Sequence, residues 1–458
     1  MMEKLQSKAI IIGISDSKEK IPAAAGRIST QPGTAMEIFD RSQDEDKNAG
    51  LIEKVTKSGH NSTLEHTVYN IAFENVSVFV EQFMIEFRLA SFTVKSRRYV
   101  DFSNCGFYSP SFGDDRLNQK YSEWASELFE LYNQFIINDI PKEDARFLLP
   151  YCLNSNFYCT LNARELLLVI KAMLYGRGKD YPELVSLGEQ LLSQVSSLTK
   201  GIAKSFEESS KAYTDSLHFN FEHSNKPSSS APVTLISHTE DAERQIAKSA
   251  LVLYGQYSQE DIDLITSNPD NVSEIVKQVL SSDRQRPLEN AVFTFRINGV
   301  SLSTVTHFAR HRIQALSVPS FTEINQDNYI VPDTIKASPE LLAKYHQAFN
   351  KTKALFDELK SLGVSESLLV YCHLSGHCVD IISTMNAREL MLFFKLRTCT
   401  RAQWEIRNFA MEMLRLCREK AAFFDYYGPG CFVGKCPEGR LSCGRQEEMK
   451  NIFTNRRK

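Results

Sequence analysis

The sequence predicts an α+β fold made of two tandem copies of one domain. The pentapeptide NAREL occurs at residues 162–166 and again at residues 386–390. Other short matches share the spacing between these two occurrences, which indicates an internal duplication. Within each copy, short apolar runs typical of strands alternate with longer segments of helical periodicity. The 458 residues suffice for two domains of ordinary size.

Four further matches keep the same register without realignment. They are Leu64-Glu65 with Leu288-Glu289, Val76-Ser77 with Val300-Ser301, Arg88 with Arg312, and Ser96 with Ser320. We therefore place the first copy at residues 1–222 and the second at residues 233–458. The segment between them, residues 223–232, reads HSNKPSSSAP, and its serine and proline content is typical of a linker.

The elements of the first copy follow from its apolar pattern. Residues 9–14 (AIIIGI) predict a strand, residues 21–30 a helix ending near Gly26, and residues 51–58 a short amphipathic helix. GHNSTLEH (59–66) predicts a polar bend, residues 67–73 a strand, and residues 78–88 an apolar helix. A cationic loop, SFTVKSRRY (91–99), precedes helices at 117–138 and 142–149. A helix then follows NAREL, and a long amphipathic helix at 184–208 ends the copy.

Composition and charge exclude several classes of protein. The formal net charge is −3 and the isoelectric point about 6.4, so no overall field attracts nucleic acid or an anionic membrane. No apolar run approaches the roughly 20 residues of a membrane span. We expect a cytoplasmic protein whose ten cysteines are free thiols or metal ligands.

A cationic triplet, Arg310-His311-Arg312, lies within FARHRIQALS (308–317). It follows a predicted strand (291–297), an Asn298-Gly299 turn and a helix that begins at 301–305. Arginine presents a rigid fork of donors and stacks on flat rings, so the triplet suits phosphate or an electron-rich ring. The alternative is a solvated group of cations that the dipole favours at a helix C-terminus.

The two copies have lost different polar groups. The first copy has Glu86-Phe87-Arg88 at the position of the triplet. The sequence SRRY (96–99) of the first copy corresponds to SFTE (320–323) in the second. Near the end of each copy, LYGRGKDYPEL (174–184) corresponds to LRTCTRAQWEIR (396–407).

Taken together, these segments resemble the flavin-dependent thymidylate synthases. That family has a GH-x-S/T-x-x-EH segment, a motif R-H-R-x-x-S-x-N-E-x-S-x-R-Y, and a C-terminal N-A-R…L-R-x-x-x-x-A-Q-W-E-I-R block. The resemblance covers nearly the whole chain, divided over two copies. It implies methylation of dUMP at C5, with FAD as cofactor, methylenetetrahydrofolate as carbon donor and NADPH as reductant.

The resemblance also implies roles for individual residues. The S-x-R-Y loop and an arginine before Leu-Pro would hold the substrate phosphate, which points to Ser96, Arg97, Arg98 and Arg146. His307, where the family has glutamine, is assigned to the substrate as well. The flavin contacts implied are Arg310, His311, Arg312, Asn386, Arg388, His60, Ser62 and Ser29. Arg397 would lie against the uracil ring and favour its ionised form.

Our hypothesis is a composite site. The first copy would supply the phosphate group's partners, and the second would supply the flavin contacts and Arg397. In the family the site lies between subunits of a homotetramer, so the resemblance implies that this chain forms a homodimer equivalent to a pseudo-tetramer.

Two alternatives rest on a departure from the family motif. Its Asn-Glu pair is replaced by Thr93-Val94 in the first copy and by Ser317-Val318 in the second. One alternative is a flavin-dependent C5 methyltransferase acting on another uridine nucleotide. The other is a nucleotide- or flavin-binding homologue without turnover. The lost pair favours the latter, and the retained Arg397 with its A-Q-W-E-I-R block favours an enzyme.

Some of these residues also suit structural roles. Asn162 and Asn386 are good helix N-caps with a glutamate three residues later, the outline of a capping box. Of Arg97 and Arg98, the register favours Arg98 as the phosphate ligand.

The C-terminal tail GPGCFVGKCPEGRLSCGR contains Cys431, Cys436 and Cys443. Cysteine is a ligand of structural zinc and of iron–sulfur clusters, and the glycines and prolines permit the tight turns of such a site. The alternative is a glycine-rich tail with free thiols.

Overall fold

The computed structural model describes residues 6–210, 213, 215 and 231–455. The chain forms two compact units, and they do not coincide with the two sequence repeats. Unit 1 comprises Met1–Ser224 and Val331–His377, and unit 2 comprises Asn225–Ile330 and Cys378–Lys458. A segment of the second repeat therefore belongs to the same unit as the first repeat. The predicted linker, apart from its last two residues, lies outside the described residues.

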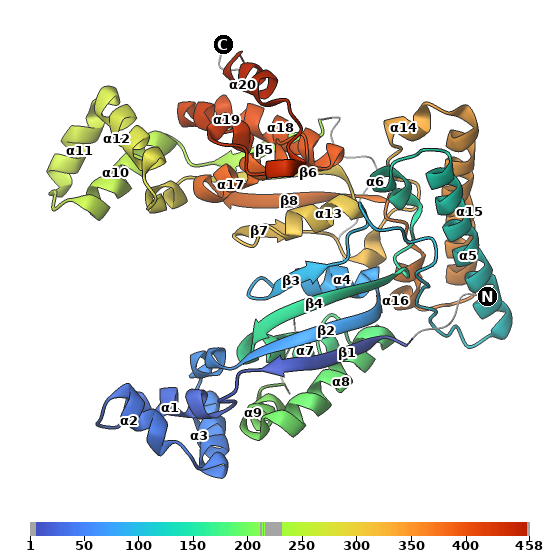
Figure 1. Cartoon of the computed structure of the whole chain (residues 1–458), viewed down its shortest axis with the longest axis horizontal. Coiled ribbons are helices and arrows are strands. Elements are labelled where there is room, and N and C mark those ends of the chain that lie inside the picture. Colours follow the sequence, from blue (N-terminus) through green and yellow to red (C-terminus); the bar gives the residue numbers. More distant parts are fainter. Residues whose placement is uncertain (1–5, 211–212, 214, 216–230, 456–458) are drawn as a thin grey trace. The chain divides into compact units, whose positions relative to one another are not determined.

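Unit 1 contains a four-stranded antiparallel sheet of order β1-β2-β4-β3 (Figure 1). Its strands are β1 (Lys8–Ile14), β2 (Val68–Ser77), β3 (Ser91–Val94) and β4 (Asn154–Asn162). Its helices from the first repeat are α1 (Lys20–Ile28), α2 (Ala35–Arg41), α3 (Glu45–Lys57), η1 (Asn61–His66), α4 (Val78–Ile85), α5 (Asp115–Ile137), α6 (Lys142–Ala145), η2 (Arg146–Leu148), α7 (Ala163–Leu174), α8 (Pro182–Leu198) and α9 (Lys200–Ser210). The second repeat adds α14 (Asp333–Lys336), α15 (Pro339–Ser361), α16 (Glu366–Leu369) and η5 (Val370–Cys372).

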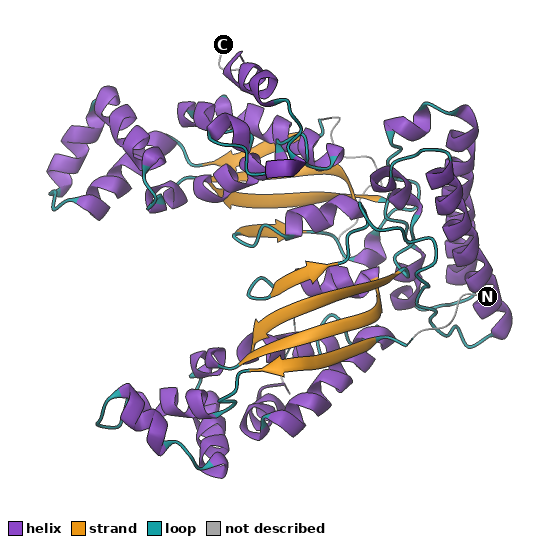
Figure 2. Cartoon of the chain, viewed as in Figure 1, coloured by secondary structure: helices purple, strands orange, loops and turns teal. Residues whose placement is uncertain are grey.

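Unit 2 repeats the same sheet as β5-β6-β8-β7 (Figure 2, orange). Its strands are β5 (Val233–His238), β6 (Val292–Ser301), β7 (Gln314–Ser317) and β8 (Cys378–Asn386). Its helices are α10 (Ala242–Tyr254), α11 (Gln259–Ser267), α12 (Pro269–Ser281), η3 (Arg286–Asn290), α13 (Leu302–Ala309), η4 (Phe321–Glu323), α17 (Ala387–Arg397), α18 (Trp404–Arg418), η6 (Ala422–Tyr426), α19 (Gly430–Val433), η7 (Gly439–Leu441) and α20 (Gln446–Asn455). The shared strand order confirms the α+β class and the duplication.

A β-bulge in the long second strand of each sheet is common to the two copies. The register shifts between Phe73 and Val76 in β2 and between Ile297 and Val300 in β6. Asn75 and Gly299, which occupy equivalent positions in the two repeats, both have positive φ, +53° and +66°. The predicted Asn298-Gly299 turn is therefore a bulge within β6, because the strand continues to Ser301.

Strand β1, which is one edge of the sheet in unit 1, is covered by glutamine side chains of α8. Gln190 accepts from the backbone N–H of Ala9 at 3.0 Å, and Gln194 accepts from that of Ile11 at 2.8 Å. Gln194 also donates to the carbonyl of Ala9 at 2.7 Å. These contacts occupy backbone groups of an edge strand that would otherwise be open to pairing with another chain.

Helices α5 and α15, which occupy equivalent positions in the two repeats, pack side by side in unit 1 (Figure 1). Near them the chain makes a symmetric pair of hydrogen bonds, from Tyr151 N–H to the His373 carbonyl (2.8 Å) and from Ser375 N–H to the Leu149 carbonyl (2.9 Å). Tyr151 is the counterpart of Ser375, and Leu149 is the counterpart of His373, so each bond is a copy of the other. Equivalent positions that face one another in this way indicate a pseudo-twofold axis.

The same pairing of equivalent positions occurs between side chains of α5 and α15. Lys351 donates to Glu127, its own counterpart in the first repeat, at 2.9 Å. Trp124 Nε1 also donates to Thr352 Oγ1 across the two helices at 3.0 Å.

Most predicted elements of the first repeat are present, with several differences in extent. The predicted long helix at 184–208 is two helices, α8 and α9, because the backbone leaves the helical region at Thr199 (φ −147°, ψ 85°). The predicted cationic loop begins with a short strand, β3, which pairs with β4. Helix α1 continues past Gly26 to Ile28, and α4 ends at Ile85. In the described part of the chain, every helix is too short or too polar to cross a bilayer.

Candidate functional site

The cationic triplet lies where α13 ends in unit 2. Arg310 is the C-cap of this helix, and His311 is buried directly after it. His311 Nδ1 is 3.0 Å from Glu389 Oε1, and Arg397 Nε donates to His311 Nε2 at 3.0 Å. The ring of Phe393 packs edge-on against the imidazole at a centroid distance of 4.9 Å. Three side chains of α17 thus converge on the histidine that follows α13.

These contacts define the protonation of His311. An arginine Nε–H can only donate, so Nε2 accepts and the ring proton is on Nδ1, which donates to Glu389. Burial lowers the pKa of His311 below its ordinary value, with Arg397 adding to the effect and Glu389 opposing it. The imidazole is therefore neutral at pH 7 and accepts a hydrogen bond from a fixed guanidinium.

Arg397 is the last residue of α17, where a cation interacts favourably with the helix dipole. In addition to His311, its guanidinium donates to the backbone carbonyl of His307 at 3.4 Å. The structure thus brings together three of the predicted site residues, Arg397, His311 and His307.

The N-terminus of α17 carries the other predicted residues of this unit. Asn386 Oδ1 accepts from the backbone N–H of Glu389 at 2.9 Å, so its predicted role as an N-cap is confirmed. The outlined capping box is incomplete, because the Glu389 carboxylate contacts His311 instead of the N-cap backbone. Arg388 forms an ion pair with Glu289 at 2.5 Å.

In unit 1, two of the predicted phosphate ligands meet at Glu143. Arg98 Nε donates to the Glu143 carboxylate at 2.9 Å, and Arg146 Nε donates to the Glu143 carbonyl at 3.1 Å. Ser96 Oγ accepts from the backbone N–H of Arg98 at 3.3 Å, which shapes the loop after β3. Lys142 of α6 donates to the carbonyl of Tyr99 at 3.4 Å. The predicted S-x-R-Y loop therefore lies against α6 and η2.

Arg97 points into the interior instead. Its guanidinium makes two hydrogen bonds to the Glu81 carboxylate, at 2.7 and 3.2 Å, and Ser155 Oγ donates to the same carboxylate at 2.7 Å. The side chains of Arg97 and Glu81 are only 6% and 1% exposed. In the second repeat the three corresponding positions carry Val305, Phe321 and Val379. One copy thus has a buried ion pair where the other has apolar side chains.

The remaining predicted flavin contacts are exposed residues of unit 1. Ser29 is the C-cap of α1, His60 is the N-cap of η1, and Ser62 lies in η1. Helices α1 and η1 pack against each other, so these residues belong to one region of the unit.

In the first repeat an arginine that follows α7, Arg177, packs against the end of α4, which the sequence did not reveal. Arg177 lies over the rings of Phe83 and Phe87, 5.0 and 5.4 Å from their centroids. These phenylalanines correspond to His307 and His311. Arg177 is also paired with Glu86 at 3.0 Å, where the second repeat has Arg310. The repeats therefore hold an arginine in the same surroundings by different contacts.

The C-terminal cysteines do not form a metal cluster among the described residues. Cys431 is buried, Cys436 and Cys443 are partly exposed, and all three are free thiols. Among the residues for which positions are given, no three His, Cys, Asp or Glu side chains are grouped so as to hold a metal ion. The structure thus gives no support to the zinc or iron–sulfur prediction.

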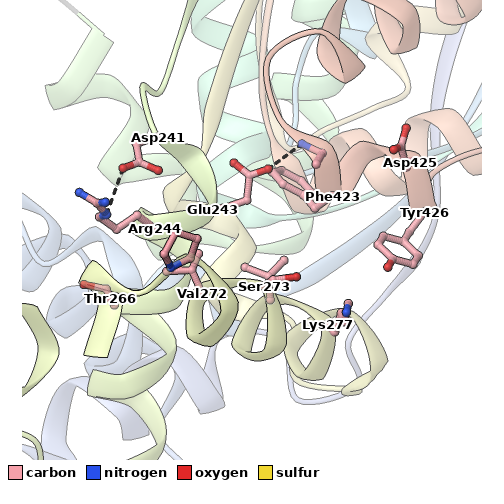
Figure 3. A pocket seen from close by; sticks show the side chains of 13 residues that line it. Asp241, Glu243, Arg244, Thr266, Val272, Ser273, Lys277, Phe423, Asp425 and Tyr426 are labelled. Carbon is pink, nitrogen blue, oxygen red and sulfur yellow. Dashed lines mark hydrogen bonds and ion pairs between the residues drawn. The ribbon is translucent and has the colours of Figure 1, made fainter. Parts of the chain in front are cut away.

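A separate cavity of about 460 Å³ lies in unit 2 between α10, α12 and η6 (Figure 3). On its rim Arg244 pairs with Asp241 at 3.1 Å, and Glu243 accepts from the backbone N–H of Ala422 at 2.6 Å. None of the predicted site residues lines it. In unit 1 the corresponding Glu19 accepts from Ile202 N–H of α9, which packs on α3. The cavity thus reflects the different path of the second repeat after α18.

Three acidic residues at these sites were missed by sequence reasoning: Glu81, Glu143 and Glu389. Glu389 was interpreted only as part of a capping box. Glu81 had a signal in the sequence, because the second repeat lacks both Glu81 and its partner Arg97. Glu143 had none, since a glutamate in a short polar helix is usually a solvated residue.

Comparison with known proteins identifies the family. The family model described as thymidylate synthase complementing protein matches residues 11–198 and again residues 234–421. The flavin-dependent thymidylate synthase of Clostridium tetani is 34% identical over 240 residues, which is 48% of this chain and 96% of that protein. The corresponding protein of Geobacter sulfurreducens is 35% identical over 226 residues, 48% of this chain and 97% of that protein.

Among solved structures, a UMP/dUMP methylase from Streptomyces cacaoi bound with 5-Br dUMP is 22% identical, with a TM-score of 0.39. The match covers 45% of the present chain and 97% of the methylase chain. The two regions matched by the family model together span more than half of the sequence. The chain therefore belongs to the thymidylate synthase complementing protein family, with two copies of the family domain in tandem.

Proposed function

We propose that this protein is a flavin-dependent methyltransferase that converts dUMP to dTMP. The main support is that flavin-dependent thymidylate synthases match about half of this chain, one family domain, over nearly their whole length. In addition, a hydrogen bond to His311 holds Arg397 in place in the second copy. In the net reaction the methylene group of methylenetetrahydrofolate and a hydride from NADPH replace the proton on uracil C5. That proton and one more from solvent go to the two folate nitrogens that release the methylene group, and the products are dTMP, tetrahydrofolate and NADP⁺.

Arg397 would act on the uracil ring. Methylation at C5 requires negative charge to develop on the ring and its carbonyl oxygens. A guanidinium held in place before the reaction stabilises that charge, and one such donor is typically worth roughly 3–4 kcal/mol. His311 and the His307 carbonyl hold Arg397 in place in the ground state.

The substrate phosphate would be bound by the loop after β3 together with η2. A phosphomonoester carries nearly two negative charges, which suits a pair of arginines. Arg98 and Arg146 lie close to one another, because both donate hydrogen bonds to Glu143. Ser96 would contribute a hydroxyl. We assign Arg97 to supporting the loop, since its charge is balanced inside the unit by Glu81.

The residues also suit FAD. Arg310 and Arg312 are exposed on either side of a buried histidine, and planar guanidinium groups match phosphate oxygens and stack on flat rings. Asn386, Arg388, His60, Ser62 and Ser29 are the remaining proposed contacts. When bound, FAD would supply the redox chemistry, and these residues would orient it.

We further propose that the phosphate ligands of the first repeat and Arg397 of the second act on the same nucleotide. The support is that each copy has lost what the other retains. At the position of Arg98 the second repeat has Thr322, and at the position of His311 the first has Phe87. The protein would function as a homodimer that provides as many domains as a tetramer of single-domain relatives.

The first experiment is the absorbance spectrum of the purified protein. We expect a flavin spectrum that bleaches on addition of NADPH and returns in air. Conversion of dUMP in the presence of methylenetetrahydrofolate, and rescue of a thymidine-requiring bacterium, would then establish the substrate. Rescue failure combined with turnover of another uridine nucleotide would favour the alternative methyltransferase. Flavin binding without any turnover would favour a regulator, which is the function that loss of the motif Asn-Glu pair supports.

The composite site is tested by combining two inactive chains. Arg98→Ala and Arg397→Ala would each be prepared alone and also co-expressed in one cell with different affinity tags. Both single variants should be inactive. Activity in the doubly tagged dimer would place the two arginines of one site on different chains, and an inactive dimer would place them on the same chain. Full activity of either single variant would overturn the composite site.

A further inference from the structure

The ring nitrogens of His311 are both engaged by protein side chains. Nδ1 is 3.0 Å from Glu389, Nε2 is 3.0 Å from Arg397, and the His311 side chain is 3% exposed. This leaves neither nitrogen to be the main partner of a cofactor. Within the triplet, the exposed Arg310 and Arg312 are the groups suited to that role.

We propose that His311, held by Glu389, is a positioning residue for Arg397. The Glu389 carboxylate accepts the Nδ1 proton and so fixes the tautomer in which Nε2 carries a lone pair. That lone pair accepts the Nε–H of Arg397 and sets the plane of the guanidinium. This inference rests on the proposed function in one respect only, the role of Arg397 in catalysis.

The first repeat shows what the same surroundings do without this histidine. Phe87 replaces His311, and Arg177 lies over aromatic faces and pairs with the carboxylate of Glu86. A carboxylate partner offsets the positive charge of an arginine, whereas a neutral imidazole directs it without offsetting it. Glu165, the counterpart of Glu389, accepts a backbone N–H instead, that of Leu89, at 3.3 Å. At this contact, the second repeat therefore orients its arginine through a neutral ring, whereas the first repeat pairs its arginine with an acid.

The imidazole of His311 lies between the acid, Glu389, and Arg397. Glu389 Oε1 contacts the far side of the imidazole, so the carboxylate orients Arg397 through the ring. A glutamate in direct contact would orient the guanidinium equally well. It would, however, reduce the attraction between Arg397 and negative charge developing on a substrate.

The first test reads the tautomer and needs no activity. In protein labelled with ¹⁵N-histidine, the His311 signals are assigned by their loss in His311→Gln. At pH 7 we expect a protonated Nδ1 and an unprotonated Nε2, with the Nε2 shift changed by Arg397→Ala. The proposal would be overturned if Nε2 is protonated, if His311 is an imidazolium ion, or if Arg397→Ala leaves the Nε2 chemical shift unchanged.

The second test separates the two hydrogen bonds by substitution. Glutamine places an amide oxygen near the position of Nε2, and asparagine places an amide N–H near that of Nδ1. If His311 positions Arg397, His311→Asn should lower kcat by about 10²-fold, the loss expected from a misplaced catalytic group, with little change in the KM for dUMP. His311→Gln should retain at least about tenfold more kcat than His311→Asn by the same reasoning.

The matched control is Glu165→Gln in the first repeat, which should leave kcat and KM unchanged. Thermal unfolding of each variant would show that it is folded. Equal kcat for the asparagine and glutamine variants would overturn the proposal. If the wild-type protein shows no turnover, the proposed function fails, and the tautomer measurement still decides the role of His311.

Discussion

Breaking the buried ion pair between Arg97 and Glu81 should destabilise unit 1 strongly. In Arg97→Met the guanidinium is lost, and the Glu81 carboxylate, with its side chain 1% exposed, is left with the hydrogen bond from Ser155. Removing one partner of a buried pair typically costs about 3–5 kcal/mol, because the remaining charge is left without compensation. For a folding unit of this size, that corresponds to a Tm lower by roughly 6–20 °C.

The second repeat supplies the control, because it fills the same three positions with apolar side chains. The triple variant Glu81→Val, Arg97→Phe, Ser155→Val copies Val305, Phe321 and Val379 into the first repeat. Replacing a buried ion pair by packed apolar residues is often neutral or stabilising, so its Tm should lie within a few degrees of wild type.

Differential scanning calorimetry of the three proteins at pH 7 provides the comparison. The reasoning is refuted if Arg97→Met lowers the Tm by less than about 2 °C, since that corresponds to under about 1 kcal/mol. It is also refuted if the triple variant is as unstable as the single one. In that case the loss would come from local packing and not from an uncompensated charge.

Three other predictions concern capping, pH and charge. Asn162→Ala removes the acceptor for the N–H of Glu165 and should cost α7 about 1 kcal/mol, measured as a lower Tm; Asn162→Ser should restore most of it. The pKa of His311 is lowered on folding, so below its ordinary value near 6.5 the unfolded state takes up a proton that the native state does not. Stability should therefore fall as the pH decreases from 6.5 through the lowered pKa, and in His311→Gln this part of the pH dependence should vanish from a Tm-against-pH series. Arg397→Ala should reduce kcat by about 10²–10³-fold. Arg177→Ala removes an arginine that is already paired with Glu86 and should change kcat by less than about threefold. Similar losses of kcat for both variants would contradict the assigned roles.

Local sequence patterns were sufficient for much of the fold. The constant offset between the copies predicted a duplicated α+β domain, and the two sheets share one strand order because each matched pair falls at the same position of the same element. The helix break at Thr199 was missed, since apolar periodicity continues across it from α8 into α9. The packing of α15 on α5 within unit 1 could not be predicted either. It depends on contacts between segments that lie in different repeats, far apart along the chain, which no local pattern reports.

Sequence analysis singled out the arginine and histidine residues of the candidate site, but not the acidic residues that contact them. The motif located Arg98, Arg146, His311 and Arg397, because arginine and histidine carry recognisable functions. Their partners are glutamates that look like ordinary surface or capping residues until the chain is folded. Only the three-dimensional contacts show that one arginine of the SRRY loop points inward and the other meets Glu143.

The pseudo-twofold pairing of α5 and α15 has a consequence for how such a chain can evolve. In an assembly of identical subunits, a residue that faces its own symmetry mate always meets a copy of itself. Glu127 would then oppose glutamate, and Lys351 would oppose lysine. Fusing the two copies removes that restriction, so an acid can face a base across the former axis, as Glu127 and Lys351 do. Covalent linkage thereby permits asymmetric specialisation that a gene for a single copy could never encode.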